Sequence, residues 1–229
     1  RKLTKTNEGL LFEKYLRSAN YNESSIKEKL AQKDLKTVNL GATKTIGDYV
    51  INKSLLNIFK NKDLNLSLYV DNTSNLLELL DHKRIGLALI EGFFDKAHYA
   101  YQLLKEESFV GICSQNHPFS GKEIPIELLF HEDLIIREEG SGTRAILEQV
   151  LLKNNHSLDS FKSLTCISSF ELIKSIVIND IGISFVYSAV ASSNPKLNTF
   201  TIKNNPITRE FNFVFLKNTD ASQLISYFK

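Results

Sequence analysis

The sequence predicts an α/β fold made of two similar halves and preceded by a long helix. From residue 36 onward, short apolar or alternating runs typical of strands are separated by helical segments, and the scheme starts again near residue 108. Strands that alternate with helices favour a mostly parallel sheet with helices on its faces. With 42% hydrophobic and 24% charged residues, the composition is that of an ordinary globular protein.

The first element is a helix expected over residues 6–33. Its apolar residues recur at steps of three and four, which places them on one stripe: Leu10, Leu11, Tyr15, Leu16, Ala19, Ile26 and Leu30. The stripe is narrow. It suits either a helix that pairs with a helix of a partner chain or a surface helix packed on its own domain.

The first half reads as βαβαβ and the second half repeats the alternation. In the first half we expect strands at 37–41, 64–70 and 85–91, with helices at 46–61 and 74–81. In the second half we expect strands at 108–114, 133–137, 164–168, 181–187, 198–203 and 209–217, a loop at 117–125, and helices at 143–154, 170–179 and 221–228. The absence of a low-complexity linker indicates that the halves pack closely.

Composition also argues against several classes of protein. A formal net charge of +2 favours neither a nucleic-acid surface nor an acidic partner. No run of about 18 apolar residues indicates a membrane span, and the N-terminus has no signal-peptide pattern. Cys113 and Cys166 lie in apolar strand-like runs and are expected to be small core residues, with redox chemistry as the alternative. The histidines show no metal-ligand spacing, so neither a metal nor a cofactor is expected.

Three strand-to-helix junctions share one pattern of hydroxyl residues. They are "GATKTIGD" with Thr43 and Thr45, "EGSGTR" with Ser141 and Thr143, and "ISSFEL" with Ser168 and Ser169. A hydroxyl followed three residues later by an acidic residue is a capping signature, strongest for Ser168 with Glu171, so helix capping is one interpretation. The other is a ligand site, because such junctions meet at the carboxyl ends of parallel strands and helix N-termini bind small anions. Lys44 and Arg144 could add positive charge there.

Catalytic interpretations find little support in these motifs. The stretch "GSGTR" has neither the spacing of a nucleophile elbow nor that of a Walker A loop. Glu138 and Glu139 are adjacent and would point in opposite directions in an extended segment, which makes a poor acid/base pair. We therefore expect a protein that is not an enzyme.

Four motifs in order resemble the LysR-type transcriptional regulators, over essentially the whole chain. "RKLTKTNEGLLFEKY" is similar to the end of the family's winged helix-turn-helix and the start of its linker helix, and "GATKTIGDYVINKSLLNIF" to the first sensor strand and helix. "REEGSGTR" resembles its Arg-Glu-Pro-Gly-Ser-Gly-Thr-Arg loop, with Glu139 in place of Pro. "SSFELIKSIVINDIGISFV" is similar to a later segment, with Asp180 in place of a Gly. The family usually has an acidic residue where Ile85-Gly86 stands.

The resemblance implies a fold like that of type 2 periplasmic binding proteins. Two Rossmann-like subdomains would be joined by two crossing strands, with the effector in the cleft between them. Residues 1–35 would be the end of the DNA-binding wing and the linker helix, 36–94 plus 204–229 the first subdomain, and 95–203 the second. The effector-binding residues expected are Thr43, Lys44, Thr45, Ser141, Gly142, Thr143, Ser168 and Phe170, and the turn Glu91-Gly92-Phe93 would form the cleft edge.

The function implied is effector sensing by a bacterial, cytoplasmic transcription regulator whose helix-turn-helix is absent from this chain. The effector would be a small metabolite, expected to be anionic in view of the three junctions. The protein would be a homodimer or homotetramer that contacts DNA but no membrane. The alternative from a different class is a periplasmic-type solute-binding protein for a small anion. It would share the fold but have no use for the wing-like "LTKTNEG".

Overall fold

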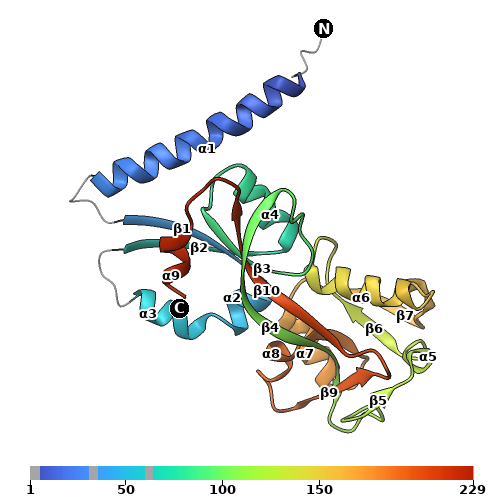
Figure 1. Ribbon diagram of the computed structural model, residues 1–229. Coiled ribbons are helices and arrows are strands. Elements are labelled where there is room, and N and C mark those ends of the chain that lie inside the picture. Colours follow the sequence, from blue (N-terminus) through green and yellow to red (C-terminus); the bar gives the residue numbers. More distant parts are fainter. Residues whose placement is uncertain (1–5, 31–35, 60–63, 229) are drawn as a thin grey trace.

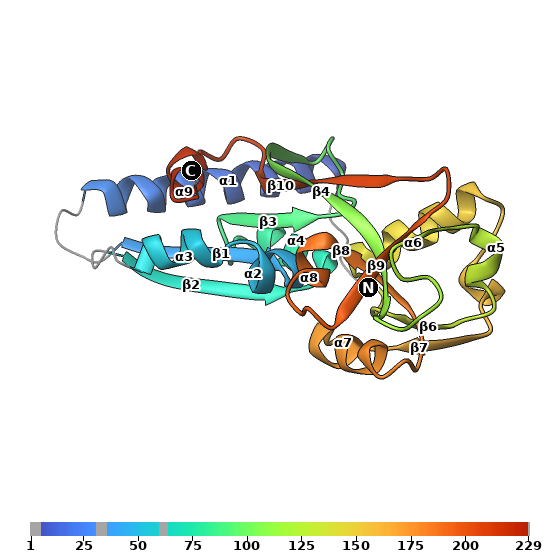
Figure 2. The same ribbon diagram turned by 90° about the horizontal axis from the view of Figure 1, so that it is seen from below.

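The computed structural model describes residues 6–30, 36–59 and 64–228 of the 229-residue chain. Its first element, α1 (Asn7–Leu30), is a long helix that lies outside the sheet along one side of the body (Figures 1 and 2). Several of its apolar side chains are not covered by the rest of the described protein. The exposed ones are Leu10, Phe12, Tyr15, Leu16 and Ile26. The predicted wing residues 1–5 and helix residues 31–33 lie outside the described residues.

The first half contains the predicted parallel strands. β1 (Lys36–Thr43) lies between β2 (Leu64–Asp71) and β3 (Leu87–Glu91) and pairs with both in parallel. β1 is the inner strand of this group and its residues 38, 40 and 42 are fully buried, whereas β2 is an edge strand that alternates between partly buried and exposed. α4 (Thr73–Asp81) connects β2 to β3 as predicted.

The helix predicted over 46–61 is wrong as a single element. It is divided into α2 (Lys44–Tyr49) and α3 (Asn52–Phe59), and the predicted end at 60–61 lies outside the described residues. The break at Val50 and Ile51 has a packing reason. Ile51 is 2% exposed in the same core cluster as Ile46, and the change of direction lets both side chains reach that core.

Two long antiparallel strands run through the middle of the molecule. β4 (Tyr99–Ser114) pairs with β10 (Ile207–Leu216) along the whole of β10, and β10 also pairs with β3. Figure 1 shows both strands passing from one half to the other. Only residues 108–114 of β4 were predicted. Its first part has no apolar alternation because much of it is exposed, including Tyr101, Gln102 and Leu103 in a row, so the sequence carried no strand signal.

The second half completes a curled mixed sheet. The strand order is β2-β1-β3-β10-β4-β9-β5, with β8 (Ser184–Tyr187) also pairing with β4. β9 (Leu197–Ile202) is antiparallel to β4, and β5 (Glu123–Ile124), which falls within the predicted loop, is parallel to β9. The prediction of a mostly parallel sheet therefore holds within each half but is wrong for the crossing strands.

The rest of the second half is a second layer that carries the loops of interest. β6 (Asp133–Ile136) and β7 (Ser163–Cys166) form a two-stranded parallel sheet, which a bridge between Leu134 and Ile183 ties to the segment before β8. The helices and short turns of the second half and the C-terminus are α5 (Ile126–Leu129), α6 (Gly142–Lys153), η1 (Leu158–Ser160), α7 (Phe170–Ile178), α8 (Ser188–Ala191) and α9 (Ser222–Ser226).

Two sequence expectations about chemistry meet different outcomes. Cys113 is fully buried in the core, as predicted, but Cys166 is exposed, because β7 is an edge strand whose four residues all face solvent. Within the described ranges no group of three or more His, Cys, Asp or Glu side chains could hold a metal ion. In the same ranges, no helix has both the length and the apolar character needed to span a bilayer.

Candidate functional site

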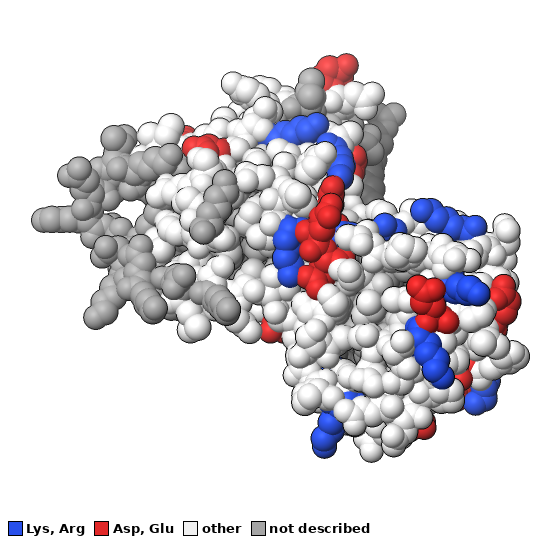
Figure 3. Space-filling model, turned by 60° about the horizontal axis from the view of Figure 1, so that its bottom comes forward, with Lys and Arg blue, Asp and Glu red and all other residues white. Residues whose placement is uncertain are grey.

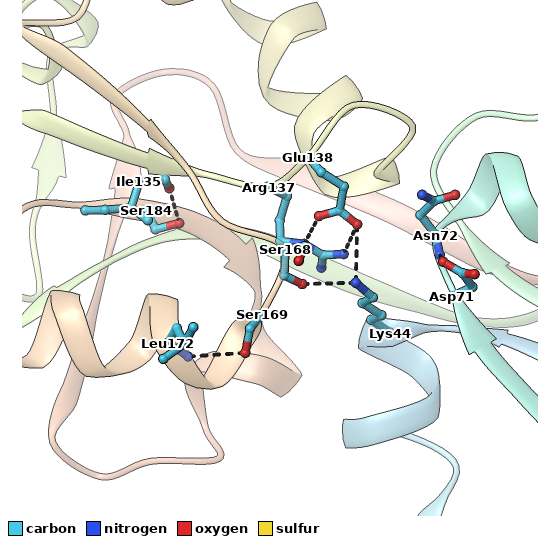
Figure 4. A network of polar contacts seen from close by, with 10 residues as sticks. All are labelled: Lys44, Asp71, Asn72, Ile135, Arg137, Glu138, Ser168, Ser169, Leu172 and Ser184. Carbon is cyan, nitrogen blue, oxygen red and sulfur yellow. Dashed lines mark hydrogen bonds and ion pairs between the residues drawn. The ribbon is translucent and has the colours of Figure 1, made fainter.

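The three predicted junctions meet around one lysine. Lys44, the first residue of α2, donates a hydrogen bond from Nζ to the main-chain oxygen of Ser168 at 3.0 Å. The same Nζ lies 3.4 Å from Oε1 of Glu138, in the loop before α6 (Figure 4). A side chain from the first half thus links two loops of the second half. We refer to residues 43–45, 137–143 and 168–170 together as the three-loop site.

Buried hydroxyls without partners mark the inside of this site. Thr43, Thr45 and Thr143 are at most 2% exposed, and the Oγ1 of each has no hydrogen-bond partner in the protein. A buried hydroxyl in that state costs about 1–3 kcal/mol relative to a paired one. Ser141 is also buried and makes no capping hydrogen bond with its side chain. These four residues are therefore available to bind something other than the protein.

Helix capping, the competing interpretation, applies to a different residue from the one predicted. Ser169 is the N-cap of α7 and accepts from the Leu172 N–H at 3.4 Å, so the capping box of Ser168 with Glu171 is wrong. Glu171 instead binds Lys174 at 2.7 Å and accepts from the Tyr49 hydroxyl at 3.0 Å. Thr45 lies inside α2 and caps nothing. The physical reason is that each helix begins one or more residues away from the start that the motif implied.

Ser168 and Phe170 have roles different from the one expected for ligand-facing side chains. Ser168 is exposed, and its carbonyl rather than its hydroxyl is used, by Lys44. Phe170 is 3% exposed and packs edge-on against Tyr49 of α2, with ring centroids 5.8 Å apart. The guanidinium of Arg137 lies 4.3 Å from the centroid of the Phe170 ring. Phe170 is thus a packing contact between the halves.

Arg137 and Glu138 form a pair that the sequence did not single out. Arg137 is 3% exposed, and its Nε and Nη2 donate to the two Glu138 carboxylate oxygens at 2.7 and 2.9 Å. Burial alone would raise the pKa of Glu138, but the hydrogen bonds and charge of Arg137, and then the charge of Lys44, hold it below its usual value. Two cations therefore surround one carboxylate. A charged residue ending the apolar run "DLIIR" is the signal that could have identified Arg137.

The turn after β3 lies against the start of α6. Gly92 has a φ of 92°, and a Cβ added there would lie 2.9 Å from the Gly142 Cα. In turn, a Cβ on Gly142 would lie 2.6 Å from the Glu91 carbonyl oxygen. Two glycines are needed at this contact because any side chain would separate the turn from the helix. The expected cleft-edge residues thus touch the second junction directly.

Glu91 places a carboxyl beneath the site. It is 3% exposed, and its Oε2 has no hydrogen-bond partner. Burial raises the pKa of Glu91 to about 7, while the nearby Thr45 hydroxyl and the Arg137 charge act in the opposite direction. Phe93, the third residue of the turn, is 47% exposed.

A pocket of about 310 Å³ opens beside the second junction. It is lined by residues at the N-terminal ends of α4 and α6, among them Thr73, Ser74, Ser141 and Gly142. Arg144 also lines it and is held by Glu148 at 2.8 Å and by Glu139 at 3.6 Å. Two helix N-termini and two serine hydroxyls facing one space are a setting that suits a small anion.

The described part of the face drawn in Figure 3 carries no broad basic patch. On the described part of the face in Figure 3, acidic and basic side chains lie side by side in a band across the middle of the molecule. Such alternation cancels over a short distance and suits ion pairing better than the binding of a phosphate backbone.

Comparisons with known proteins agree with this architecture. The family model described as LysR substrate binding domain matches residues 31–229. The chain is 29% identical over 192 residues to the HTH-type transcriptional regulator CysL of Bacillus subtilis, a match that covers 83% of this chain and 60% of that protein. The chain spans less than two thirds of the length of the curated relatives that it matches.

Solved structures show the same fold. The regulatory domain of CcmR from Synechocystis PCC6803, in complex with 2-PG, matches with a TM-score of 0.74 at 23% identity, over 84% of this chain and 95% of that one. A C206 mutant of OxyR from Corynebacterium glutamicum matches with a TM-score of 0.72 at 20% identity, over 97% of this chain and 72% of that one. The predicted fold, two α/β subdomains joined by two crossing strands, is confirmed.

Proposed function

This chain belongs to the LysR substrate-binding domain family, and from that premise we propose that it is the effector-sensing part of a bacterial LysR-type transcription regulator. The effector is a small anion bound at the three-loop site between the subdomains. The relatives reported above are named as regulators, which supports this function over a free solute-binding protein and over an enzyme. The protein needs no cofactor for this role and works in the cytoplasm, where its DNA is.

The observation that carries the proposal is the set of buried hydroxyls without partners. Thr43 and Thr45 come from the first half of the chain and Thr143 from the second, so one ligand could bind to both. Hydroxyls donate to an anion at a lower desolvation cost than a charged group does. Arg137 and Lys44 hold Glu138, and the charges of both also act on Asp48, so cations and carboxylates balance there and the hydroxyls are the groups that support anion binding.

The division of the chain supports a mechanism by subdomain movement. We propose the boundaries expected from the sequence, with 36–94 plus 204–229 as one subdomain and 95–203 as the other. The C-terminal segment joins the first half through β10, whose residues Phe211 to Val214 pair with β3 (Figure 1). An anion that contacts both subdomains favours one relative angle, and it can do so only through its different affinity for the two arrangements.

The signal would leave through α1. Its exposed apolar residues support pairing with α1 of a second copy, in a homodimer or homotetramer. A change in subdomain angle then alters the spacing of the α1 helices, and with it the way in which the full-length regulator engages DNA. The DNA contacts themselves would lie outside the residues described.

Calorimetric titration with a panel of anions tests the site. The panel contains sulfate, phosphate, small dicarboxylates and 2-PG, the compound bound to CcmR. We expect one of them to bind, and Thr43→Ala and Thr143→Ala each to weaken it by about 1.5–3 kcal/mol, the value of a hydrogen bond to a charged group. Thr201→Ala, at an exposed position of β9, is the matched control and should leave the affinity unchanged. Full affinity in both cleft variants would show that the anion binds elsewhere.

A further inference from the structure

A second pocket, of about 550 Å³, lies where the crossing strands meet α6. We call it the β10 pocket. Its walls come from the turn after β3, from Glu106 of β4, from residues 208–210 and 212 of β10, and from Gln149 and Lys153 of α6. Figures 1 and 2 show α6 next to the crossing strands. It shares only Gly92 and Phe93 with the residues expected to bind the effector or edge its cleft.

The β10 pocket contains a buried amide that is only half satisfied. Asn212 is 2% exposed, and its Nδ2 donates to Oε2 of Glu210 at 3.4 Å, but its Oδ1 has no partner. Asn212 follows an irregularity in the β4–β10 ladder. Phe211 pairs with Lys105 and Asn212 with Leu103, which leaves Leu104 as an extra residue. Bulges of this kind reorient side chains and are frequent beside functional sites.

Arg209 is held in place and still has a donor without a partner. Its Nη1 donates to the Thr208 oxygen and its Nη2 to Oε1 of Gln149, each at 3.2 Å. The guanidinium lies 5.8 Å from the centroid of the Phe93 ring. Its Nε is buried without a hydrogen-bond partner. A guanidinium fixed on two sides with a third N–H unused is prepared for a carboxylate.

The charges around the β10 pocket are mixed. Lys96 is paired with Glu210 at 3.2 Å, so these two cancel. Lys153 and Glu106, both exposed, take part in no ion pair within the described residues. The groups left over are thus two cations, Arg209 and Lys153, and two acceptors, Glu106 and the Asn212 Oδ1. We infer that the β10 pocket binds a small zwitterion of the α-amino acid class, with its carboxylate on Arg209 and Lys153 and its ammonium on Asn212 and Glu106.

The position of the β10 pocket gives such a ligand an influence on the three-loop site. Its walls come from elements on both sides of the crossover, so a bound amino acid favours one subdomain arrangement. Arg209 also acts on Tyr187, whose buried hydroxyl lacks a partner: burial and the charge of Glu91 raise the pKa of Tyr187, and the charge of Arg209 lowers it. Because both ligands then act on the same subdomain arrangement, they affect each other's affinity reciprocally.

The test is calorimetric titration of the 229-residue protein with each of the common α-amino acids. For each amino acid that binds, two analogues follow: the amine without the carboxylate and the hydroxy acid without the ammonium. We expect saturable binding of at least one amino acid and a loss of about tenfold or more with either analogue. No binding in the whole series would overturn the inference. Equal binding of the hydroxy acid would also overturn it, since the pocket would then be an anion site.

Variants locate the ligand and keep this test separate from that of the proposed function. Lys153→Gln and Glu106→Gln, both at exposed positions, should each weaken amino-acid binding about tenfold, whereas Lys203→Gln, another exposed lysine, should not. Thr143→Ala should retain amino-acid binding even though it binds the effector anion more weakly. If Thr143→Ala abolished amino-acid binding and the two β10-pocket variants did not, the ligand would occupy the three-loop site and the inference would be wrong.

Discussion

Two pairs of helix N-termini in this protein use their hydroxyl and amide residues in opposite ways. At α4 the Asn72 side chain accepts from the Asn75 N–H at 2.9 Å, and at α7 the Ser169 side chain accepts from the Leu172 N–H. At α2 and α6 the N-cap residues, Thr43 and Ser141, have the right side chains and make no such bond. Both of these are buried, whereas Asn72 and Ser169 are partly exposed.

The difference suggests that the capped N-termini contribute to stability and the uncapped ones to ligand binding. A capping hydrogen bond stabilises a helix by about 1 kcal/mol, and two of these N-termini have one. At the other two, the hydroxyls of Thr43 and Thr143 lie at the three-loop site without partners, as does Oε2 of Glu91. Residue types that look alike in the sequence thus do different work, and each prediction below asks whether that division is real.

The largest effect is expected at Glu91, beneath the two uncapped ends. Its pKa of about 7 lies above the ordinary value of 4.5, so the folded protein holds the proton more tightly than the unfolded chain does. The contribution of Glu91 to the free energy of unfolding is complete below about pH 4.5 and is lost as the pH rises through 7. Glu91→Gln has no charge to bury at any pH. Between pH 4 and pH 8 its free energy of unfolding should therefore rise relative to that of the wild type by up to about 3 kcal/mol.

Urea unfolding across this pH range measures the Glu91 effect. Glu123→Gln, at an exposed position of β5, is the control and should follow the wild-type profile. If the Glu91→Gln profile had the same slope as the wild type, Glu91 would be ionised in the folded protein. The uncapped N-termini would then already stabilise the Glu91 carboxylate and would not be free to bind a ligand.

Gly142→Ala tests the contact between the uncapped end of α6 and the turn after β3. The new Cβ would lie 2.6 Å from the Glu91 carbonyl oxygen, so helix and turn must separate at a cost of about 1–3 kcal/mol. We expect thermal unfolding at a lower temperature and weaker effector binding. Gly121→Ala is the control: it introduces a side chain at a φ of 70°, but no atom lies within 4 Å of the new Cβ, so it should leave effector affinity intact. Equal effects on affinity would mean that the contact does not position the site.

The smallest effect completes the comparison directly. Ser169→Ala removes a capping bond and should lower the free energy of unfolding by about 1 kcal/mol. Thr43→Ala removes no hydrogen bond and should cost less, while reducing effector affinity. Urea unfolding of both variants, beside the wild type, gives the answer. Equal destabilisation would show that Thr43 stabilises α2 after all.

Much of the fold could be predicted because its signals are local. Most strands, α4, α6 and α7 carry apolar periodicity that sequence alone displays, and the motif resemblance supplied the two-subdomain arrangement. The missed elements lack such a signal. The first part of β4 shows no apolar alternation because much of it is exposed. The break between α2 and α3 depends on where the Ile51 side chain can enter the core.

The sequence by itself determined the α/β class, the family and the three junctions that meet around Lys44. It could not tell which hydroxyl caps a helix, because Ser168 and Ser169, or Thr43 and Thr45, are equivalent until a helix start is fixed to within one residue. It could not pair Lys44 with Glu138, or bring Gly92 against Gly142, because these contacts join segments far apart in the chain. Only tertiary packing decided which polar groups were used within the protein and which were left without a partner.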